Sequence, residues 1–505
     1  MGFSSGSTSL LENESSTDAH NAAEKAMACV VGWREDPIQY EKALSSYVEA
    51  GVRCVVVGVD GGEKADMAMV GVFRNVFPDS AANVLCLQQS LGKQFIRKAL
   101  ANGFKSGKPA PTTSEKDAFR KAYDFTKSEM EKAGFLRSKE PPKGVCFYQP
   151  HCDLKEIRFS AWMVSVIIAD VYGFDYLWVS DSDTQILPDT VTTLARVLKS
   201  EPKAAGAGAY VRLHNAEVSS ISRMAGLAWA LDTYMNRAAL SALGTSECLN
   251  GPTSMYRVSA LREVMVVQYR FHYLESTENT VINEDIQTTM MLAKRGWKRL
   301  YVEYASALTG GPETLRAWYG QRLRWSRGIN FHRFFDAPYI ASQGPLTIWY
   351  WLRSGFYDVF VFLWVLWYAI FGTELFKITR YDVLVFELLP PIYNFLRCQA
   401  PMPSLPVSVT LFACYRFVCP SYRMLTFITP FSTSWALPQK STETPFYPLS
   451  FVHREFEALF FMLWTGIAGG AVGRAVATFL GNENVLPWMM AFMMAGASAG
   501  FYTIE

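Results

Sequence analysis

The sequence predicts an α/β domain with a mostly parallel β-sheet, followed by an all-α transmembrane region. Two observations lead to this fold class. From about residue 28 onward, short β-rich runs alternate with helical patterns, which is typical of a parallel sheet with crossover helices. After about residue 342 the chain becomes apolar and aromatic over stretches long enough to cross a bilayer. The expected strands are Ala28–Val31, Val52–Val59, Gly144–Tyr148 and Tyr176–Val179, and the expected helices include Ile38–Ala50 and Phe159–Val171.

Length and charge restrict the classes of function. The chain has 505 residues, which is enough for a domain of about 300 residues and a second module. Its 48 basic and 46 acidic residues nearly cancel, whereas nucleic-acid binding usually requires a strongly basic face, so no nucleic-acid partner is expected. The nine cysteines lack CxxC pairs and metal-ligand spacing, which favours reduced thiols in a protein that faces the cytosol.

Composition divides the chain into three parts. Residues 1–27 are polar and lack the apolar stretch of a signal peptide, so we expect a disordered tail. Residues 28–341 form the expected cytosolic domain, with a helical insert at 101–143. The helical pattern of that insert runs through Ser114–Lys132 and is typical of a solvated surface helix. Residues 342–505 hold the expected transmembrane and interfacial helices.

The C-terminal part contains several candidate spans. Leu346–Gly372 carries only two charges, Arg353 and Asp358, and is long enough to cross a bilayer. Phe456–Leu480, which contains four glycines that allow close helix packing, and Leu486–Tyr502 are further candidates. Two weaker stretches are Tyr381–Leu396, which Pro390 and Pro391 interrupt, and Leu405–Cys419, which is short and bounded by prolines.

A pair of carboxylates follows one predicted strand. Leu177–Ser180 is apolar and leads directly into Asp181 and Asp183. Ligands of α/β folds bind at the carboxyl ends of the strands, and carboxylates can hold a diphosphate through a divalent cation such as Mg²⁺ or Mn²⁺. The alternative is that the DxD sequence forms a solvated turn or a helix cap.

Two other strand ends suit a nucleotide. Val55–Val59 leads into Asp60 and a glycine turn, which would allow a base or ribose to approach the backbone. Val31 is followed by Trp33 and Glu35, and the indole ring could stack on a base. Each of these segments could also be an ordinary loop or cap.

Glu284 and Asp285 open a predicted helix at Ile286–Arg295. Acidic residues in a first helical turn are favoured by the helix dipole, so capping alone would explain them. A carboxylate at a buried helix start could instead serve as a general base that deprotonates a hydroxyl group.

Gln321, Arg324 and Trp325 form a QxxRW sequence at helical spacing. The arginine could stabilise charge on a leaving diphosphate, and the tryptophan could form a flat wall for a sugar ring. The alternative is a basic amphipathic helix on the membrane surface, which would include Arg322, Arg327 and Arg333; we expect both roles, on different faces of the helix.

These motifs, in this order, resemble those of the inverting, membrane-integrated glycosyltransferases of family 2, which include hyaluronan, chitin and cellulose synthases. The chain looks most like the hyaluronan synthases, from about residue 28 to residue 435. The resemblance implies a GT-A-like nucleotide-diphospho-sugar transferase domain. It also implies a gating-loop-like segment at 432–445 that contains Trp435, which would close over the donor.

The resemblance implies a role for each motif residue. The implied catalytic residues are Asp285 as general base, Glu284 and Arg324, and the implied metal ligands for Mg²⁺ or Mn²⁺ are Asp183 and Asp181. The implied nucleotide-sugar-binding residues are Trp33, Glu35, Asp60, Lys155, Asp181, Gln321 and Trp435. The implied acceptor-binding residues are Cys248, Gly251, Pro252 and Trp325.

The sequence departs from the hyaluronan synthases at several of these motifs. Asn250 stands where they commonly carry Ser, and the Gly-Lys-Arg segment is not intact around Lys155 and Arg158. Asn-Glu-Asp at Asp285 is closer to the Thr-Glu-Asp of cellulose synthases, and Ala-Leu-Pro replaces Gly-Thr after Trp435. The departure at Asp285 bears on the product rather than on the chemistry. The N-terminal spans of the family are not expected here, so a pore would be built differently.

The expected function is processive, inverting transfer from a UDP-sugar to a growing polysaccharide, coupled to export. The expected protein is a multi-pass protein of the plasma membrane, in contact with lipid, with a cytosolic catalytic domain; it could form a homo-oligomer. For Trp435 to reach the cytosolic site, Leu405–Cys419 must be interfacial or re-entrant. A lipid glycosyltransferase of the ceramide type is the nearest alternative. A non-catalytic transporter or receptor with a degenerate nucleotide-binding domain is the second.

Overall fold

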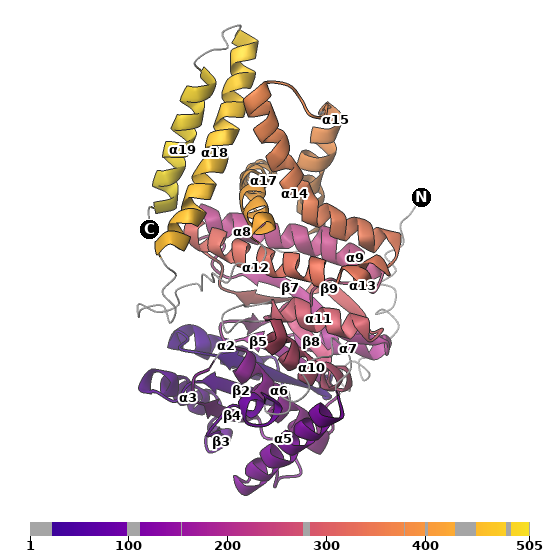
Figure 1. Ribbon diagram of the computed structural model, residues 1–505. Coiled ribbons are helices and arrows are strands. Elements are labelled where there is room, and N and C mark those ends of the chain that lie inside the picture. Colours follow the sequence, from indigo (N-terminus) through magenta and orange to yellow (C-terminus); the bar gives the residue numbers. More distant parts are fainter. Residues whose placement is uncertain are drawn as a thin grey trace. The chain divides into compact units, whose positions relative to one another are not determined.

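The computed structural model describes residues 23–97, 112–152, 154–275, 283–377, 379–398, 402–429, 451–480 and 486–503 (Figure 1). The chain divides into two compact units. Unit 1 comprises Met1–Arg212, Arg237–Glu275 and Gln287–Thr309, and unit 2 comprises Leu213–Asn236, Ser276–Ile286 and Gly310–Glu505.

Unit 1 is built on a nine-stranded mixed sheet with the order β3-β4-β2-β1-β5-β8-β7-β9-β6. The strands are β1 Ala26–Gly32, β2 Val55–Asp60, β3 Val84–Cys86, β4 Gly144–Gln149, β5 Tyr176–Asp181, β6 Gln185–Ile186, β7 Ala204–Leu213, β8 Ser254–Arg257 and β9 Lys298–Thr309. The first five strands pair in parallel, whereas β8 runs antiparallel to both β5 and β7, and β6 runs antiparallel to β9. The four predicted strands and the mostly parallel sheet are therefore confirmed, and the antiparallel half of the sheet was not predicted.

The helices of unit 1 are α2 Pro37–Glu49, α3 Lys64–Val76, α5 Thr113–Lys132, α6 Leu154–Tyr172, α7 Thr190–Ser200, α9 Ala238–Ala242 and α10 Val258–Glu275, together with short helical turns at Pro78–Ser80 and Gly92–Ile96. The helix α11 Glu284–Lys294 begins in unit 2 and continues in unit 1. The helices predicted for this unit, Ile38–Ala50, Ser114–Lys132 and Phe159–Val171, are confirmed within about five residues. The predicted surface helix is α5, whose one buried face includes Ala118, Ala122 and Met130.

The central strand β1 explains why this part of the chain is so apolar. Met27, Cys29 and Val31 pack on the side of the sheet that α6 covers, whereas Ala28 and Val30 pack with side chains of α2 and α3. Side chains alternate between the faces of a strand, so a strand covered on both faces must be apolar throughout. The polar groups that follow such strands therefore stand out as candidates for a site.

Unit 2 is helical. Its helices are α8 Ser220–Leu231, α12 Leu315–Phe335, α13 Ala337–Ala341, α14 Pro345–Phe371, α15 Arg380–Val383, α16 Leu389–Arg397, α17 Leu405–Ile428, α18 Phe451–Leu480 and α19 Leu486–Thr503. A π-helical segment at Asp232–Arg237 follows α8, and another at Leu384–Leu388 joins α15 to α16. Within the described ranges, Pro345–Phe371 and Phe456–Leu480 are long and apolar enough to cross a membrane.

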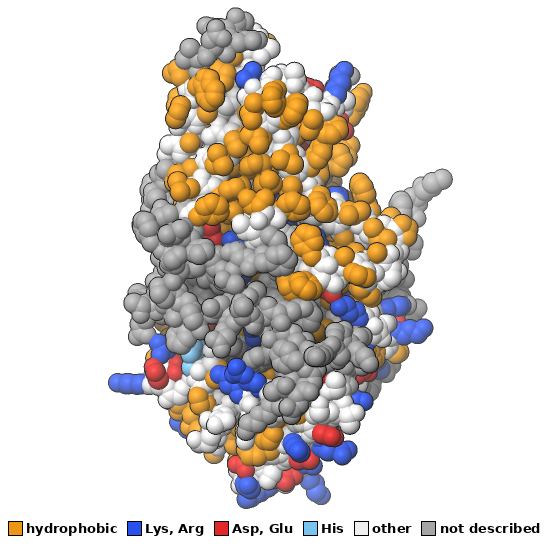
Figure 2. All heavy atoms as spheres, viewed as in Figure 1, with side chains coloured by type: hydrophobic (Ala, Val, Ile, Leu, Met, Phe, Trp, Pro, Cys, Tyr) orange, Lys and Arg blue, Asp and Glu red, His pale blue; other side chains and the backbone are white. Residues whose placement is uncertain are grey.

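The surfaces of these helices fit a membrane setting. Only 17% of the apolar window of α14 is buried, and Figure 2 shows hydrophobic side chains gathered over one face of this part of the chain. Helices α18 and α19 pack closely at Gly469. A Cβ at this position would lie only 2.6 Å from the Met490 carbonyl oxygen, so the close packing requires glycine. The glycines of α18 thus serve the close helix packing that their pattern predicted. The segment Leu486–Tyr502 is helical, and its crossing of the membrane stays a prediction.

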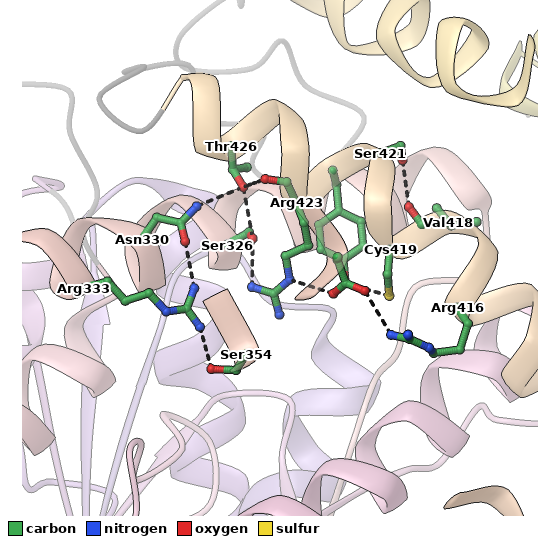
Figure 3. Close-up of polar contacts among 12 residues, drawn as sticks. Ser326, Asn330, Arg333, Ser354, Arg416, Val418, Cys419, Ser421, Arg423 and Thr426 are labelled. Carbon is green, nitrogen blue, oxygen red and sulfur yellow. Dashed lines mark hydrogen bonds and ion pairs between the residues drawn. The ribbon is translucent and has the colours of Figure 1, made fainter. Parts of the chain in front are cut away.

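The two weaker candidate spans, Tyr381–Leu396 and Leu405–Cys419, are both helical. The interruption expected at Pro390 and Pro391 is wrong, because both lie in the first turn of α16, which follows the π-helical segment Leu384–Leu388 without a break. The end expected at Cys419 is wrong, because α17 continues through Pro420 to Ile428. Proline removes one helical hydrogen bond, but the packing of α17 against α12 and α14 outweighs that loss. In the turn around Pro420, Ser421 Oγ donates to the Val418 carbonyl at 2.8 Å (Figure 3).

Candidate functional site

The carboxylates of the DxD sequence lie at the carboxyl end of β5 in unit 1. Asp181 pairs in register with Val31 of β1, and its side chain is 42% exposed. Ser182 is buried and donates to Glu35 Oε2 at 2.7 Å. A Cβ on Gly32 would lie 2.5 Å from the Ser182 Cβ, so the glycine lets the DxD turn approach β1. Thus Glu35, predicted to bind a nucleotide, holds the DxD turn in place.

Asp183, the second carboxylate, is held by neighbouring hydroxyl groups. Its Oδ1 atom accepts from Thr309 Oγ1 at 3.3 Å and from Thr184 Oγ1 at 3.5 Å. The solvated-turn alternative does not account for this packing, because the turn is tied to both β1 and β9.

A divalent cation would fit these two carboxylates only together with other ligands. Within the described part of the chain, no group of three or more His, Cys, Asp or Glu side chains could hold a metal ion. Asp181 and Asp183 offer hard oxygen ligands, and Mg²⁺ commonly takes one or two carboxylates together with phosphates of its substrate. Asp181, which is half-exposed, is open to such a ligand. The donor set therefore fits a cation that a diphosphate would complete.

Basic residues of α6 lie beside the DxD turn. The buried guanidinium of Arg158 places Nη2 3.9 Å from Asp181 Oδ1. Lys155 precedes Arg158 by three residues and therefore lies on the same helix face, where it is partly exposed. The structure thus places a buried cation next to the first DxD carboxylate.

Asp60 lies at the end of β2 in a second polar group of unit 1. Its buried carboxylate is 2.9 Å from His151 Nδ1 and accepts from the Cys152 backbone N–H at 3.2 Å. Burial lowers the pKa of His151, but the hydrogen bond and charge of Asp60 outweigh that effect, so the pKa lies above its ordinary value of 6.5. Trp33 stacks on the His151 ring, with centroids 4.5 Å apart and planes at 19°.

His151 was missed in the sequence, although it follows β4 at the same edge of the sheet. His151 stacks on the Trp33 indole, and the Arg34 guanidinium also lies over this ring, 5.2 Å from its centroid. The Asp60–His151 pair and Trp33 together form a polar and aromatic group of the type that binds a base and ribose.

The loops around this group are fixed by strained or crowded backbone. A Cβ on Gly61, whose φ is +147°, would lie 2.1 Å from Asp66 Oδ2, so only glycine fits. Asp66 is buried and lies 3.2 Å from Arg34 Nε, and Arg34 Nη2 lies 2.6 Å from Glu63. Arg34 itself has a φ of 46°, an unusual value for a residue other than glycine. The geometry of the β1 and β2 ends is therefore specified by ion pairs rather than left to solvent.

The segment Cys248–Pro252 is also part of unit 1. Asn250 is buried, accepts a hydrogen bond from Arg237, and donates to Thr253 Oγ1 at 3.3 Å. Cys248 is buried too, and its carbonyl accepts from Arg237 Nη1 at 2.9 Å. Through these hydrogen bonds, Cys248 and Asn250 fix the backbone of the segment Cys248–Pro252. Gly251 and Pro252 remain partly exposed, and the Pro252 carbonyl accepts from Ser180 Oγ of β5 at 2.8 Å, directly before the DxD sequence.

In unit 2, the predicted base segment is attached to the helix that carries QxxRW. Asn283 is buried and donates from Nδ2 to the Trp325 carbonyl of α12 at 3.0 Å. It packs on Gly328, where a Cβ would lie 2.5 Å from the Asn283 Cγ. Asp285 follows two residues later, is partly exposed, and accepts from the Ile286 backbone N–H at 2.7 Å. Asp285 therefore contributes a hydrogen bond to the start of α11, as the capping alternative requires. Asn283 also attaches the segment of Asp285 to the backbone of Trp325.

Aromatic rings surround one arginine next to Trp325. The Trp229 ring of α8 meets the Trp325 ring edge-on, with centroids 5.4 Å apart. The Arg322 guanidinium lies 4.8 Å from the Trp325 centroid, 5.4 Å from that of Trp318 and 5.9 Å from that of Trp229. Gln321 and Arg324 of the motif are partly exposed on the same helix.

The arginines of α12 that were expected on a membrane-surface face contact protein groups instead. Arg322 lies among tryptophans, Arg327 is 3.3 Å from Glu457 of α18, and Arg333 donates to Asn330 and to Ser354 of α14 (Figure 3). These cations bind protein groups because a partly buried guanidinium is stabilised by acceptors and rings.

A polar network ties α12 to two other helices of unit 2. Arg423 of α17 donates to Ser326 Oγ at 3.0 Å, next to Trp325 (Figure 3). Asp358 of α14 lies 2.9 Å from Arg416 Nη1 and 3.9 Å from Arg423 Nε. The lone acidic residue of the predicted span is therefore paired with two arginines rather than exposed to lipid. The predicted Trp435 and the segment 432–445 lie outside the described residues.

Comparisons with known proteins agree with the motifs. Residues 176–417 match the family described as Glycosyl transferase family group 2. Human hyaluronan synthase 2 is 23% identical over 337 residues, which cover 66% of this chain and 55% of that protein. Human hyaluronan synthase 3 is 22% identical over 335 residues, and hyaluronan synthase 2 of Xenopus laevis is 23% identical over 336 residues. Both matches again cover 66% of this chain and 55% of the relative. The chain thus spans about half the length of the curated relatives it matches.

The predicted resemblance is confirmed by these matches. Residues 176–417 are similar in sequence to the family 2 glycosyltransferases, and 66% of the chain is similar to hyaluronan synthases. The mixed sheet and the helical C-terminal part agree with a GT-A-like fold followed by apolar helices.

Proposed function

We propose that this chain transfers a sugar from a UDP-sugar to the end of a growing polysaccharide in a membrane. The observation that carries the proposal is the attachment of the Asp285 segment to the QxxRW helix through Asn283. A general base and an acceptor wall are needed in one place for transfer to a hydroxyl group. The similarity to hyaluronan synthases supports a polysaccharide as the acceptor.

In this proposal unit 1 binds the donor. The Trp33, Asp60 and His151 group would take the base and ribose, and the DxD carboxylates would face the diphosphate. Mg²⁺ or Mn²⁺, when bound at Asp181 and Asp183, would neutralise charge on the diphosphate. The Arg158 and Lys155 cations of α6 would add positive charge at the same end of the sheet.

Unit 2 would supply the acceptor side and the base. Trp325 forms a wall for the terminal sugar ring, and Asp285 takes the proton from its hydroxyl group. The hydroxyl oxygen attacks the anomeric carbon as the bond to UDP breaks, and Arg324 stabilises the negative charge on the departing diphosphate. Direct displacement inverts the anomeric carbon, so an α-linked donor gives a β-linked product.

Export and location belong to the same proposal. Helices α14 and α18 are apolar enough to cross a membrane, which supports a multi-pass protein that passes its product outward. We infer the plasma membrane as its location, with the catalytic domain on the cytosolic side, where UDP-sugars are available. The segment around Trp435 would act as a gating loop over the donor. A homo-oligomer is compatible with this arrangement.

Product analysis tests the proposal. Purified protein in lipid nanodiscs should be supplied with each UDP-sugar, alone and in pairs, together with Mg²⁺ or Mn²⁺. We expect a polymer that stays in the aqueous phase on solvent extraction and that a linkage-specific glycosidase degrades. A single sugar on an extractable lipid would instead support the ceramide-type alternative, and binding of UDP-sugar without any turnover would support a non-catalytic membrane protein.

A further inference from the structure

Arg322 is the arginine of the QxxRW helix that contacts three indole rings. Trp318 and Trp325 come from the same helix, and Trp229 comes from α8. The guanidinium carbon lies within 6 Å of all three centroids, at 4.8 Å from Trp325. Rings at these distances attract the positive charge, but they leave the N–H groups at the guanidinium edge without acceptors.

Two of those N–H groups are unpaired in the structure. The Nε and Nη2 atoms of Arg322 are buried and make no hydrogen bond with any residue that the structure describes. Arg333 and Arg423 of this unit also have a buried Nε without a partner, but their terminal nitrogens donate to hydroxyl or amide groups, as those of Arg416 do to carboxylates. Burying unpaired donors of a charged group is unfavourable, so oxygen atoms that reach this edge after a shift of the surrounding side chains would stabilise it.

The chemistry of the unpaired edge limits what could bind. Nε–H and one Nη–H of a guanidinium point in parallel from the same edge, which matches two neighbouring oxygen atoms. A sugar offers such a pair of oxygens as two vicinal hydroxyl groups or as the carboxylate of a uronic acid. The edge lies beside Trp325, whose ring is the proposed wall for the acceptor sugar.

We propose that Arg322 is an acceptor-binding residue whose Nε and Nη2 donate to two neighbouring oxygens of the growing chain, with Trp229 as a second aromatic wall. This inference rests on the proposed function, because it presumes that Trp325 binds the acceptor. Arg322 then sets acceptor affinity and has no part in binding the donor. A carboxylate would bind more tightly than two hydroxyls, since the hydrogen bonds would be charge-assisted on both sides.

The test separates acceptor binding from donor binding. Arg322→Met and Arg322→Lys would be compared with the parent and with Arg120→Met, a control at an exposed arginine of α5. Two rates are measured: release of UDP with water as acceptor, and transfer to labelled oligosaccharide primers that end in a neutral hexose or in a uronic acid. Melting temperature and tryptophan fluorescence report on folding.

We expect Arg322→Met to raise the KM for primer by about ten- to a hundredfold, as for loss of hydrogen bonds to a charged group, with UDP release and donor KM within about twofold of the parent. Arg322→Lys keeps the charge but loses the parallel edge, so its KM lies between. A larger effect on uronic-acid primers assigns the oxygen pair to a carboxylate, and equal effects assign it to hydroxyls.

Two results would overturn the inference. One is an Arg322→Met protein with the parental KM for both primers. The other is an equal fall in UDP release and transfer together with a lower melting temperature in both variants, which means that Arg322 only packs the tryptophans. If the parent protein neither releases UDP nor transfers sugar, the proposed function fails first, and the inference falls with it.

Discussion

Gly328→Ala should separate the positioning of the base from the stability of the fold. A Cβ at Gly328 would lie 2.5 Å from Asn283 Cγ, 2.6 Å from its Oδ1 and 2.7 Å from its Nδ2. Ordinary contacts between carbon atoms are about 3.5–4.0 Å, so Asn283 must move by roughly 1 Å. That shift breaks the 3.0 Å hydrogen bond to the Trp325 carbonyl and displaces the segment that leads to Asp285.

The expected loss of rate is large and the expected loss of stability is small. A misplacement of about 1 Å costs on the order of a hundredfold in rate. Alanine is favoured over glycine within a helix by about 1 kcal/mol, whereas crowding in a packed site costs about 1–3 kcal/mol, so the net change in stability should lie between about zero and 2 kcal/mol.

Gly71→Ala is the matched control, because Gly71 also lies within a helix and nothing is within 4 Å of the added Cβ. Sugar transfer, UDP affinity and melting temperature are measured for both variants in nanodiscs. We expect Gly328→Ala to lose transfer while it keeps UDP affinity, and Gly71→Ala to match the parent or to melt slightly higher. Equal transfer rates in the two variants would refute the positioning of the base by Asn283.

Four further outcomes are expected. Asp285→Asn should keep UDP binding yet lose about a hundred- to ten-thousandfold in turnover, and a near-normal rate would mean that the carboxylate only caps α11. Excess EDTA should stop turnover and added Mn²⁺ should restore it, whereas full turnover in EDTA would exclude a required metal at the DxD carboxylates. Because the pKa of His151 is raised by Asp60, the gain in melting temperature over His151→Gln should be complete below about pH 6.5 and should vanish as the pH rises through the folded pKa; a difference that does not change with pH would contradict this. Asp358→Asn leaves Arg423 without its carboxylate partner and Arg416 with Glu387 alone, and should destabilise unit 2 by up to about 3 kcal/mol, whereas Glu374→Gln, at an exposed residue just after α14, should change little; equal melting temperatures would contradict a structural role for Asp358.

Much of unit 1 could be predicted because its parallel strands carry their own signal. Strands such as Val55–Asp60 are apolar on both faces, and the acidic residue at the end of each strand marks the edge where ligands bind. The other half of the sheet gives no such signal. β7 reads Ala-Ala-Gly-Ala-Gly-Ala, and its glycines are needed because a Cβ on Gly206 would lie 2.8 Å from the Met255 carbonyl oxygen. That requirement comes from the neighbouring strand and cannot be seen in the local sequence.

The site was predicted in its motifs but not in the residues that hold them. His151 and Trp229 lie outside any recognisable motif, and Asn283 begins the Asn-Glu-Asp motif without a role that the motif predicts. The roles of all three depend on contacts with residues between 40 and 120 positions away in the sequence. Arg322 was assigned to a membrane-surface face because its helix is basic. The tryptophans that surround it come partly from α8, so the sequence of α12 alone could not reveal them.

The proposed base and the proposed acceptor wall belong to the same unit of the chain. Asp285 and Trp325 are tied together through Asn283 in unit 2, whereas Asp181 and Asp183 belong to the sheet of unit 1. An enzyme that extends one chain repeatedly must keep its base at a fixed distance from each new terminal hydroxyl, and a base that moves with the acceptor wall meets that need. Substitutions that loosen α12 away from Gln321 and Arg324 should therefore reduce transfer far more than they reduce UDP affinity. An α12 variant that lost UDP affinity in proportion to transfer would show instead that the base is positioned with the donor.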